Sequence, residues 1–398
     1  MTRYITILLL SVLLTGCVAA PVETHMPTVE TVVPDDPTTD PHNVETGVHD
    51  GPTTDPLLLL IDTMTTEEKA AQLFVIQPES LDITTDAAAI TKELLAQYPV
   101  GGFLITGDNI ESAEQIRLLT AAIRENSPLP PLIATDEEGG LVARFANKKF
   151  LNLPKYKNAA SVGASGDPED AREMGRTIGG YLRDFGINMD LAPVADVNTN
   201  PKNPIIGKRA FSSDPAVVRD MTAAMAAGLR ETGIIPTYKH FPGHGDTEQD
   251  SHTELAVSYK TLEELAACEW LPYEDIPPEI CVMVAHVALP NVTGDMTPAT
   301  LSPEIIGGFL RQQLGYTGVV ITDGMEMRAI TKRYTDGEAA VLAILAGCDI
   351  ILQPRDFHAA YEGVLAAVRD GTISEDRLNE SVYRILRLKQ SYNLLQPT

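Results

Sequence analysis

The sequence predicts an α/β fold, a (β/α)8 TIM-type barrel, because short apolar runs alternate with amphipathic helical stretches. The candidate strands are eight apolar runs at 73–76, 100–105, 132–135, 187–192, 234–238, 281–285, 319–322 and 349–352. Helical patterns lie between them at 111–126, 215–232, 303–314, 337–346 and 375–394, and several follow a Ser or Asp that is a favoured N-cap. A doubly wound open sheet is the rival fold, but no GxGxxG follows the first run to support it.

Length and charge limit the classes of function. The chain has 398 residues, of which 44% are hydrophobic, enough to bury one large core. The chain contains 30 Lys and Arg and 55 Asp and Glu, which gives a net charge of -25. Such a charge repels phosphate backbones, so we expect no nucleic-acid partner. The simplest role of the excess acidic residues is to keep the protein soluble.

The N-terminus predicts a lipoprotein signal peptide over residues 1–16. Arg3 is followed by the apolar run 5–14, which is too short to span a bilayer, and then by Leu-Thr-Gly-Cys at 14–17. These four residues resemble a bacterial lipobox, which would make Cys17 the lipidated first residue of a membrane-anchored, extracytoplasmic protein. An ordinary signal peptide with an incidental cysteine is the alternative. The leaflet is left open.

Residues 17–56 predict a disordered tether. They are rich in Pro, Thr and Asp, lack helical or strand periodicity, and repeat Pro-Thr-Thr-Asp-Pro at 37–41 and 52–56. The barrel is then expected over 57–398. The three remaining cysteines, Cys268, Cys281 and Cys348, show no CxxC spacing, so they indicate neither a zinc cluster nor a disulfide framework.

Polar residues follow the predicted strands where each one ends. The stretch 136–140, Asp-Glu-Glu-Gly-Gly, follows the third run and 190–196 the fourth; Lys239 and His240 follow the fifth, His286 the sixth and Asp323 the seventh. The carboxyl ends of parallel barrel strands share one face, so these side chains are expected to converge on one pocket.

The segment 239–252, Lys-His-Phe-Pro-Gly-His-Gly-Asp-Thr-Glu-Gln-Asp-Ser-His, has the density of ionisable groups expected of an active-site loop. Zinc hydrolysis is one alternative, with ligands from His240, His244, His252, Asp246 and Asp250, but the loop lacks HExxH spacing and holds a lysine. Acyl transfer is another, although no GxSxG elbow is present.

Retaining glycosyl transfer fits these residues best, because it needs a carboxylate nucleophile and a separate proton donor. Asp323 ends an apolar run, and Gly324 beside it leaves room for a substrate. In Asp250-Ser251-His252 the aspartate can orient the imidazole, which then donates and later accepts a proton. An N-cap role for Asp323 and a plain surface pair for Asp250 and His252 are the structural alternatives.

The segment 239–252 resembles the KHFPGHGxxxxDSH signature of family 3 glycoside hydrolases, in the branch of β-N-acetylglucosaminidases related to NagZ. The stretches 136–144, 190–196, 209–211, 283–286 and 318–323 resemble its other motifs in order, so the resemblance covers about residues 57–395. It implies that Asp323 is the nucleophile, His252 the acid/base and Asp250 its partner. It also implies that the cleaved sugar is held by Asp136, Arg144, Arg209, Lys239 and His240.

The resemblance also shapes what else we expect. Arg144 and Arg209 are open to a plain salt-bridge role, and His244 and Asp246 are expected to shape the loop. Many relatives have Arg where this chain has Leu141. The chain ends soon after its last helical pattern, so the second domain from which family β-glucosidases draw their acid is not expected, which favours an N-acetylglucosaminidase.

The expected activity is therefore exo-hydrolysis of terminal β-linked N-acetylglucosamine from peptidoglycan-derived or chitin-type saccharides, without cofactor or metal, by a monomer. A glycoside phosphorylase or β-glucosidase of the same family is the alternative enzyme. A non-catalytic glycan-binding lipoprotein is the alternative from another class.

Overall fold

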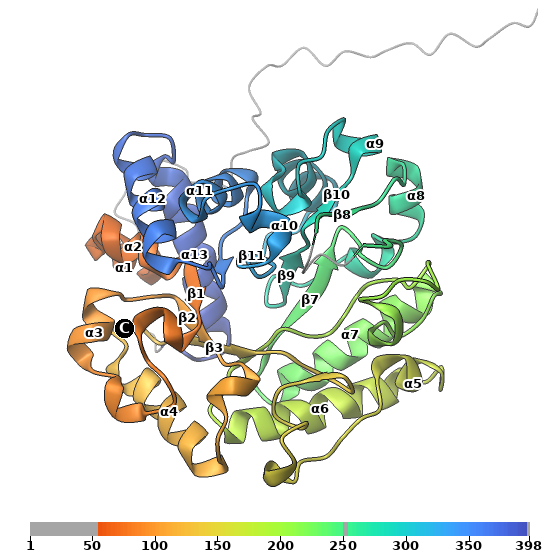
Figure 1. Cartoon of the computed structure of the whole chain (residues 1–398), viewed down its shortest axis with the longest axis horizontal. Helices are drawn as coiled ribbons and strands as arrows, with labels where there is room; N and C mark the ends of the chain where they lie inside the picture. The colour runs from red at the N-terminus through yellow and green to blue at the C-terminus, as the bar shows by residue number, and fades with distance from the viewer. Residues whose placement is uncertain (1–54, 250–253, 396–398) are drawn as a thin grey trace, which may run out of the picture. The chain divides into compact units, whose positions relative to one another are not determined.

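The computed structural model describes residues 55–249 and 254–395, and these form a parallel β-barrel surrounded by helices (Figure 1). Eight strands pair in the order β11-β9-β7-β6-β3-β2-β1-β12, with every pairing parallel. A parallel bridge between Ile321 and Ile350 links the two ends of this order, so the barrel is nearly closed. The prediction of a (β/α)8 barrel is confirmed.

The barrel strands are β1 Phe74–Ile76, β2 Gly102–Leu104, β3 Leu132–Thr135, β6 Met189–Asp190, β7 Ile235–Phe241, β9 Cys281–Val284, β11 Val320–Thr322 and β12 Ile351–Leu352. Each of the eight lies within, or overlaps, one of the eight predicted runs. All of their residues are buried, as expected of strands covered on both faces. Two small sheets lie outside the barrel: β4 Glu137–Gly139 with β5 Val142–Ala143, and β8 Ala256–Val257 with β10 Val287–Ala288.

The helices are α1 Pro56–Thr63, α2 Thr66–Gln72, α3 Lys92–Gln97, α4 Ala113–Asn126, α5 Ala159–Gly163, α6 Pro168–Asp184, α7 Pro215–Glu231, α8 Leu262–Ala267, α9 Pro290–Thr293, α10 Arg328–Thr331, α11 Asp336–Ala346, α12 Phe357–Arg369 and α13 Glu375–Ser391. Short 3₁₀ turns lie at Pro78–Leu81, Ala87–Ala89, Gly107–Asn109, Lys149–Leu151, Gly207–Arg209, Leu271–Tyr273 and Ala299–Leu301. The segment Glu304–Gln313 is a π-helix. None of the helices among the described residues is both long and apolar enough to cross a membrane.

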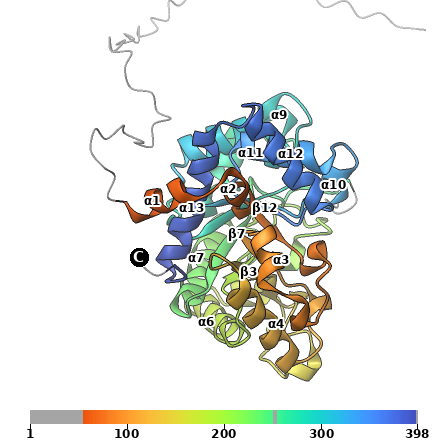
Figure 2. The same cartoon turned by 90° about the vertical axis from the view of Figure 1, so that its left-hand side faces the viewer.

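The expected helix starts are present. The Ser112 hydroxyl accepts from Gln115 N at the start of α4 (3.1 Å), and Asp214 accepts from Ala216 N at the start of α7 (2.9 Å). These caps satisfy amides that would otherwise have no partner in the first turn. The first two helices, α1 and α2, pack beside the last helix, α13 (Figure 2).

A buried lysine lies at this packing of the first helices on the last. The Lys389 side chain is fully buried, and its ammonium donates to Gln72 Oε1 (2.9 Å) without forming an ion pair to any described residue. Burial lowers the pKa of Lys389 to about 7. Below pH 7 the folded protein must therefore carry a buried, unneutralised charge.

We expect Lys389→Met to stabilise the protein at pH 7 by an amount that shrinks as pH rises. The unfolded lysine titrates near pH 10.4, so between pH 7 and 10.4 the unfolded state binds more protons and wild-type stability rises with pH. The gap in unfolding free energy between variant and wild type should fall by on the order of 2–4 kcal/mol across this window. Urea denaturation at several pH values measures it, with exposed Lys92→Met as control; a constant gap would contradict the prediction.

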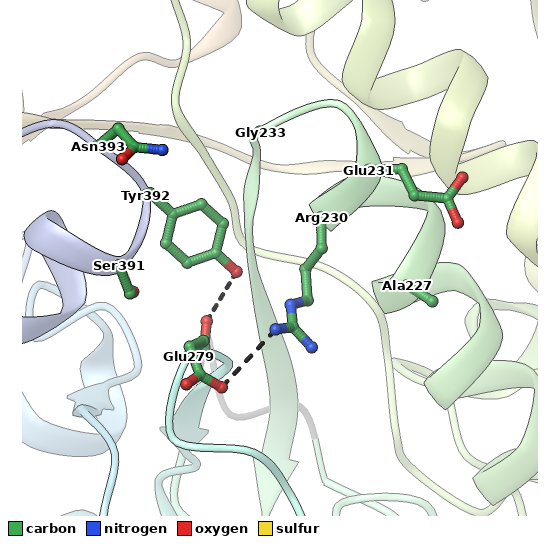
Figure 3. A pocket seen from close by; sticks show the side chains of 8 residues that line it. All are labelled: Ala227, Arg230, Glu231, Gly233, Glu279, Ser391, Tyr392 and Asn393. Atoms are coloured by element: carbon green, nitrogen blue, oxygen red, sulfur yellow. Dashed lines mark hydrogen bonds and ion pairs between the residues drawn. The ribbon is translucent and has the colours of Figure 1, made fainter.

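A surface hollow of about 470 Å³ lies at the amino ends of β7 and β9 (Figure 3). Gly233 precedes β7 and Glu279 precedes β9, and the Tyr392 hydroxyl donates to the Glu279 carbonyl (2.8 Å) across the hollow. Arg230 lies 3.7 Å from the Glu279 carboxylate. Because barrel enzymes react at the carboxyl ends of their strands, this hollow is on the wrong side for chemistry.

Candidate active site

Side chains from distant parts of the chain meet at the carboxyl ends of the strands, as predicted. Asp136 follows β3, and Lys239 lies in β7, yet the Lys239 ammonium is 2.8 Å from Asp136 Oδ1. Asp196, beyond β6, contacts His240 of β7. The barrel topology thus brings together residues that are up to about a hundred positions apart.

The centre of the site is a network of three cations and two carboxylates. Lys239 Nζ lies 2.8 Å from Asp136 and 2.7 Å from Glu138 Oε1. Arg209 binds Glu138 in a two-point pairing, with distances of 2.9 and 2.8 Å. Arg144 lies at the rim, 3.3 Å from Asp136. Asp136 is therefore fixed by two cations while it retains some exposure to solvent.

Glu138 is the most strongly neutralised carboxylate of the network. Its side chain is 3% exposed, and burial alone would raise its pKa. Arg209 and Lys239 outweigh burial and hold the pKa of Glu138 well below its usual range. The carboxylate is ionised at any pH at which the protein works, and it orients both cations.

A register irregularity in β7 explains how two consecutive residues serve one site. Along a regular strand, Lys239 and His240 would point to opposite faces. The pairing of β7 with β9 shifts between Tyr238 and Phe241, and a shift of this kind re-aims side chains. Lys239 contacts the carboxylates of the hairpin, and His240 contacts Asp196 and lies 3.5 Å from Arg209.

His240 is oriented by a buried aspartate. Its Nδ1 donates to Asp196 Oδ2 (2.6 Å), and the other oxygen of Asp196 accepts from His244 N (2.7 Å). Burial raises the pKa of Asp196, but His240 and the further contacts bring it below the ordinary value. The Nε2 atom of His240 lies 3.5 Å from the Arg209 guanidinium.

Asp323 lies directly after β11, partly exposed, with its amide bound to the Val284 carbonyl of β9 (3.0 Å). Its Oδ1 accepts from Gly324 N (2.8 Å). Burial raises the pKa of this carboxyl, yet His240, His286 and Lys239 hold it below its usual value. A carboxylate with a lowered pKa, partly exposed at the mouth of a barrel, has the properties of a nucleophile.

His286 supports the loop of Asp323 from behind. It is fully buried, with Nδ1 2.8 Å from the Thr300 hydroxyl and Nε2 donating to the Gly324 carbonyl (3.0 Å). The Thr300 hydroxyl also lies 2.8 Å from the Ala285 carbonyl. His286, which follows β9, therefore holds the backbone that follows β11 beside Asp323.

The described part of the glycine-containing loop after β7 is built tightly. A Cβ on Gly245 would lie 1.8 Å from the Val197 carbonyl, so only glycine fits there. The His244 ring binds the Thr247 hydroxyl (2.7 Å), and burial lowers the His244 pKa to about 4. Asp246 accepts from Ser258 (2.6 Å). His244 thus contacts its own loop through Thr247, and Asp246 ties the loop to Ser258, which follows β8.

Comparison with known proteins defines the family of this arrangement. The model of the glycosyl hydrolase family 3 N-terminal domain matches residues 65–388. The chain belongs to glycosyl hydrolase family 3. It is 32% identical to the β-hexosaminidase LpqI of Mycobacterium tuberculosis, over 82% of this chain and 83% of the relative.

Two further relatives are longer than this family 3 chain. It is 33% identical to β-hexosaminidase A of Pseudoalteromonas piscicida over 75% of its own length, but spans only 54% of that relative. The solved family 3 β-N-acetylglucosaminidase of Paenibacillus sp. FPU-7 superposes with a TM-score of 0.78 and 36% identity, over 84% of this chain and 64% of that one. The match supports the barrel fold.

The structure does not test every predicted residue of this family 3 site. Asp136, Arg144, Arg209, Lys239 and His240 are brought together, and Asp323 lies near enough to Lys239 and His240 for these groups to lower its pKa. Asp250 and His252 lie outside the described residues, as does Cys17. Arg144 forms an ion pair with Asp136, and Arg209 forms one with Glu138. The alternative of a salt-bridge role therefore agrees with the contacts of both arginines.

Glu138 and Asp196 belong to the site although the sequence did not single them out as binding residues. Strand periodicity offers a signal for Glu138: it stands two residues after Asp136, so both side chains share one face of an extended segment. Asp196 lies in the stretch 190–196 that was expected at the pocket, but its contact with His240 depends on the path of the chain beyond β6.

Cys268, Cys281 and Cys348 are free thiols, and Cys281 and Cys348 are buried. Within 55–249 and 254–395, no cluster of three or more His, Cys, Asp or Glu side chains has the arrangement of a metal site. Asp250 and His252, two of the five residues of the zinc alternative, lie outside these ranges.

Proposed function

We propose that this family 3 glycosidase is a retaining exo-β-N-acetylhexosaminidase that removes terminal β-linked N-acetylglucosamine. The observation that carries the proposal is the position of Asp323 directly after β11 at the barrel mouth, near enough to Lys239 and His240 for these groups to lower the pKa of its carboxyl. The relatives named β-hexosaminidase and the solved β-N-acetylglucosaminidase support the sugar specificity.

The reaction would proceed in two displacements. In the first, an Asp323 oxygen bonds to the anomeric carbon while the glycosidic C–O bond breaks, and the leaving oxygen takes a proton from His252. In the second, water gives a proton to His252, bonds to the anomeric carbon and frees Asp323. Asp250 would keep the imidazole oriented through both steps, and the product would retain its configuration.

The charged network would hold the sugar that is cleaved. Asp136 presents a carboxylate fixed by Lys239 and Arg144, and such a group accepts strongly from sugar hydroxyls. Lys239, Arg209 and the Nε2 edge of His240 face the same space from β7 and the loop after β6. Because these groups are already paired with one another, they need little rearrangement when the sugar binds.

Hydrolysis of 4-nitrophenyl N-acetyl-β-D-glucosaminide, with and without inorganic phosphate, tests the proposal. We expect release of free β-N-acetylglucosamine as the first product, seen by proton NMR before the anomers equilibrate, at a rate that phosphate does not raise. Sugar 1-phosphate would identify a phosphorylase instead. Binding of the sugar without turnover would identify a glycan-binding protein, and faster release from the β-glucoside would identify a β-glucosidase.

We further propose the domain layout that the N-terminal sequence indicates: a signal peptide at 1–16, a lipid anchor on Cys17, a tether to residue 56 and the barrel over 57–398. Support comes from the lipobox-like Leu-Thr-Gly-Cys at 14–17 and from the composition that follows it. A monomer on the outer side of a membrane would then reach peptidoglycan-derived or chitin-type saccharides. Labelling with a fatty-acid analogue, lost in Cys17→Ser, tests the anchor.

A further inference from the structure

The surface hollow at the amino ends of β7 and β9 has the size of a small-molecule site. Its volume of about 470 Å³ falls within the range of about 300–1,000 Å³ that is usual for such sites. Its lining comes from the end of α7, from the residues just before β7 and β9, and from the end of α13 with the two residues beyond it (Figure 3). The candidate active site lies at the carboxyl ends of the same strands, so the two are separate places on the barrel.

Tyr392 supplies an aromatic surface in the hollow. Its side chain packs against the hydrophobic core and also lines the hollow, between Asn393 and Ser391 on one side and Arg230 on the other (Figure 3). The hydroxyl donates to the Glu279 carbonyl (2.8 Å), which fixes the ring in place. A fixed aromatic ring offers a large apolar contact area at little cost in conformational entropy, and the C–H face of a sugar ring is a matching apolar surface.

Groups that can bind hydroxyls surround this ring. The Arg230 guanidinium and the Glu279 carboxylate lie 3.7 Å apart, and both side chains keep more than a third of their surface exposed. Asn393 is exposed and carries an amide that donates and accepts. The Ser391 hydroxyl donates to the Leu388 carbonyl (2.8 Å), so its oxygen can still accept. The hollow therefore offers hydrogen-bond donors and acceptors next to one apolar face.

The charges that line the hollow are balanced within the protein. Glu231 forms ion pairs with Arg172 and Arg176 of α6. Arg230 and Glu279 form a second pair. An anion would approach two carboxylates, and a cation would approach guanidinium groups, so neither ion gains a large net attraction. The lining therefore suits a ligand without charge.

We propose that this hollow is a second saccharide-binding site, which takes a neutral saccharide. A purely apolar ligand fits less well, because Ala227 and Tyr392 are the only apolar or aromatic residues among those described that line the hollow. A neutral sugar matches the lining, since it combines an apolar ring face with hydroxyls that donate and accept. Such a site lies beyond the proposed function, which concerns the carboxyl ends of the strands. A saccharide held there raises the local concentration of the protein on its ligand.

Native mass spectrometry of the full-length protein tests the proposal by counting bound saccharides. The probe is the trisaccharide of β-1,4-linked N-acetylglucosamine, and the parent protein is Asp323→Asn, which should bind this probe without cleaving it. We expect two saccharides per chain, one at each site. Tyr392→Ser removes the ring and should lower the count by one, whereas Tyr392→Phe keeps the ring and should leave the count unchanged.

Two further variants change the hollow with little effect on its backbone. Asn393 has a φ of +56°, so Asn393→Gly removes the amide at a position that glycine adopts readily. Ala227→Gln brings a longer side chain into the hollow from α7, where glutamine is a good helix former. We expect each to weaken the second binding event by about fivefold, the effect of losing one hydrogen bond or its space. These two variants decide the matter if Tyr392→Ser lowers the thermal melt.

The matched control is Tyr383→Ser on the same helix, α13. Tyr383 is also half-buried and its hydroxyl also donates, to Asp55 (3.0 Å), but it does not line the hollow. This control should keep both saccharides.

A count that stays the same in folded Tyr392→Ser would overturn the second site and leave the proposed function standing. An equal loss in Tyr383→Ser would overturn it as well, because the effect would then not depend on the hollow. If wild type cleaved no N-acetylglucosaminide while Tyr392→Ser still bound one saccharide fewer than its parent, the proposed function would fail and the second site would stand.

Discussion

Asp323→Asn is expected to lower kcat by about 10⁴-fold or more while the protein stays folded, because an amide cannot form the glycosyl ester. The asparagine oxygen can still accept from Gly324 N, which is 2.8 Å from the native carboxylate. A thermal melt within a few degrees of wild type would show that the loss is chemical. The exposed carboxylate of Glu326, three residues further along the same loop, gives the matched control: Glu326→Gln should retain most activity.

A rescue experiment separates the nucleophile from the acid/base. In Asp323→Gly, azide can enter from the side on which Asp323 attacks, so the expected product is the α-glycosyl azide. In His252→Gly, azide attacks the glycosyl ester from the other side and gives the β-glycosyl azide. Appreciable activity of Asp323→Asn without azide would mean that another group, such as the acetamido oxygen of the substrate, performs the attack.

The alternation of apolar runs and helical patterns predicted this barrel because it is a local property of the chain. Each apolar run is long enough to be recognised as a strand. Ser112 and Asp214 are N-cap residues that mark the starts of α4 and α7. Boundaries were less predictable. The run 187–192 yields only Met189–Asp190 as β6, and Glu304–Gln313 winds as a π-helix that no hydrophobic period distinguishes from an α-helix.

Some features of the site could also be predicted from the sequence, and others could not. Asp136, Lys239 and Asp323 were visible because each follows a predicted apolar run, and barrel topology sends the carboxyl ends of such runs to one face. The β7 register shift, which aims both Lys239 and His240 at the site, depends on the pairing with β9 and has no local signal. Asp196 likewise becomes a partner of His240 only once the barrel closes.

Charge shows the limit of composition most clearly. A net charge of -25 favours solubility and disfavours the binding of polyanions. Both effects depend on the electrostatic field at long distance from the protein. The surface beside the site is set by which loops follow β3 and β6, and residues 139–166 and 197–213 of these loops contain lysine without acid. The local charge beside the site therefore follows from the strand order and not from the total.

Glu138→Gln is expected to cost about 3–5 kcal/mol of stability and most of the sugar binding, because it leaves two buried cations without their shared carboxylate. Lys239 is 3% exposed and Arg209 15%, so neither can regain full hydration. The two cations would repel each other and pull on Asp136, which would become the nearest remaining anion. We therefore expect a large rise in KM together with the loss of stability, measured by substrate kinetics and urea denaturation.

A second buried carboxylate at the opposite end of the barrel provides the control. Asp349 is fully buried and pairs with Arg311 (2.7 Å) and Arg384 (3.1 Å), remote from the strand ends that carry the site. Asp349→Asn should cost comparable stability but leave the KM of the folded protein unchanged. If Glu138→Gln behaved in the same way, Glu138 would be a structural residue and not one that orients the binding groups.

Charge balance can be restored without restoring the site. In Glu138→Gln with Arg209→Gln, one cation leaves with the carboxylate, so Lys239 faces Asp136 alone and the electrostatic penalty is reduced. We expect the double variant to recover part of the unfolding free energy lost in Glu138→Gln, while its KM stays high, because the Arg209 donors beside His240 are gone. Recovery of KM along with stability would show that the network serves folding and that the sugar does not depend on its geometry.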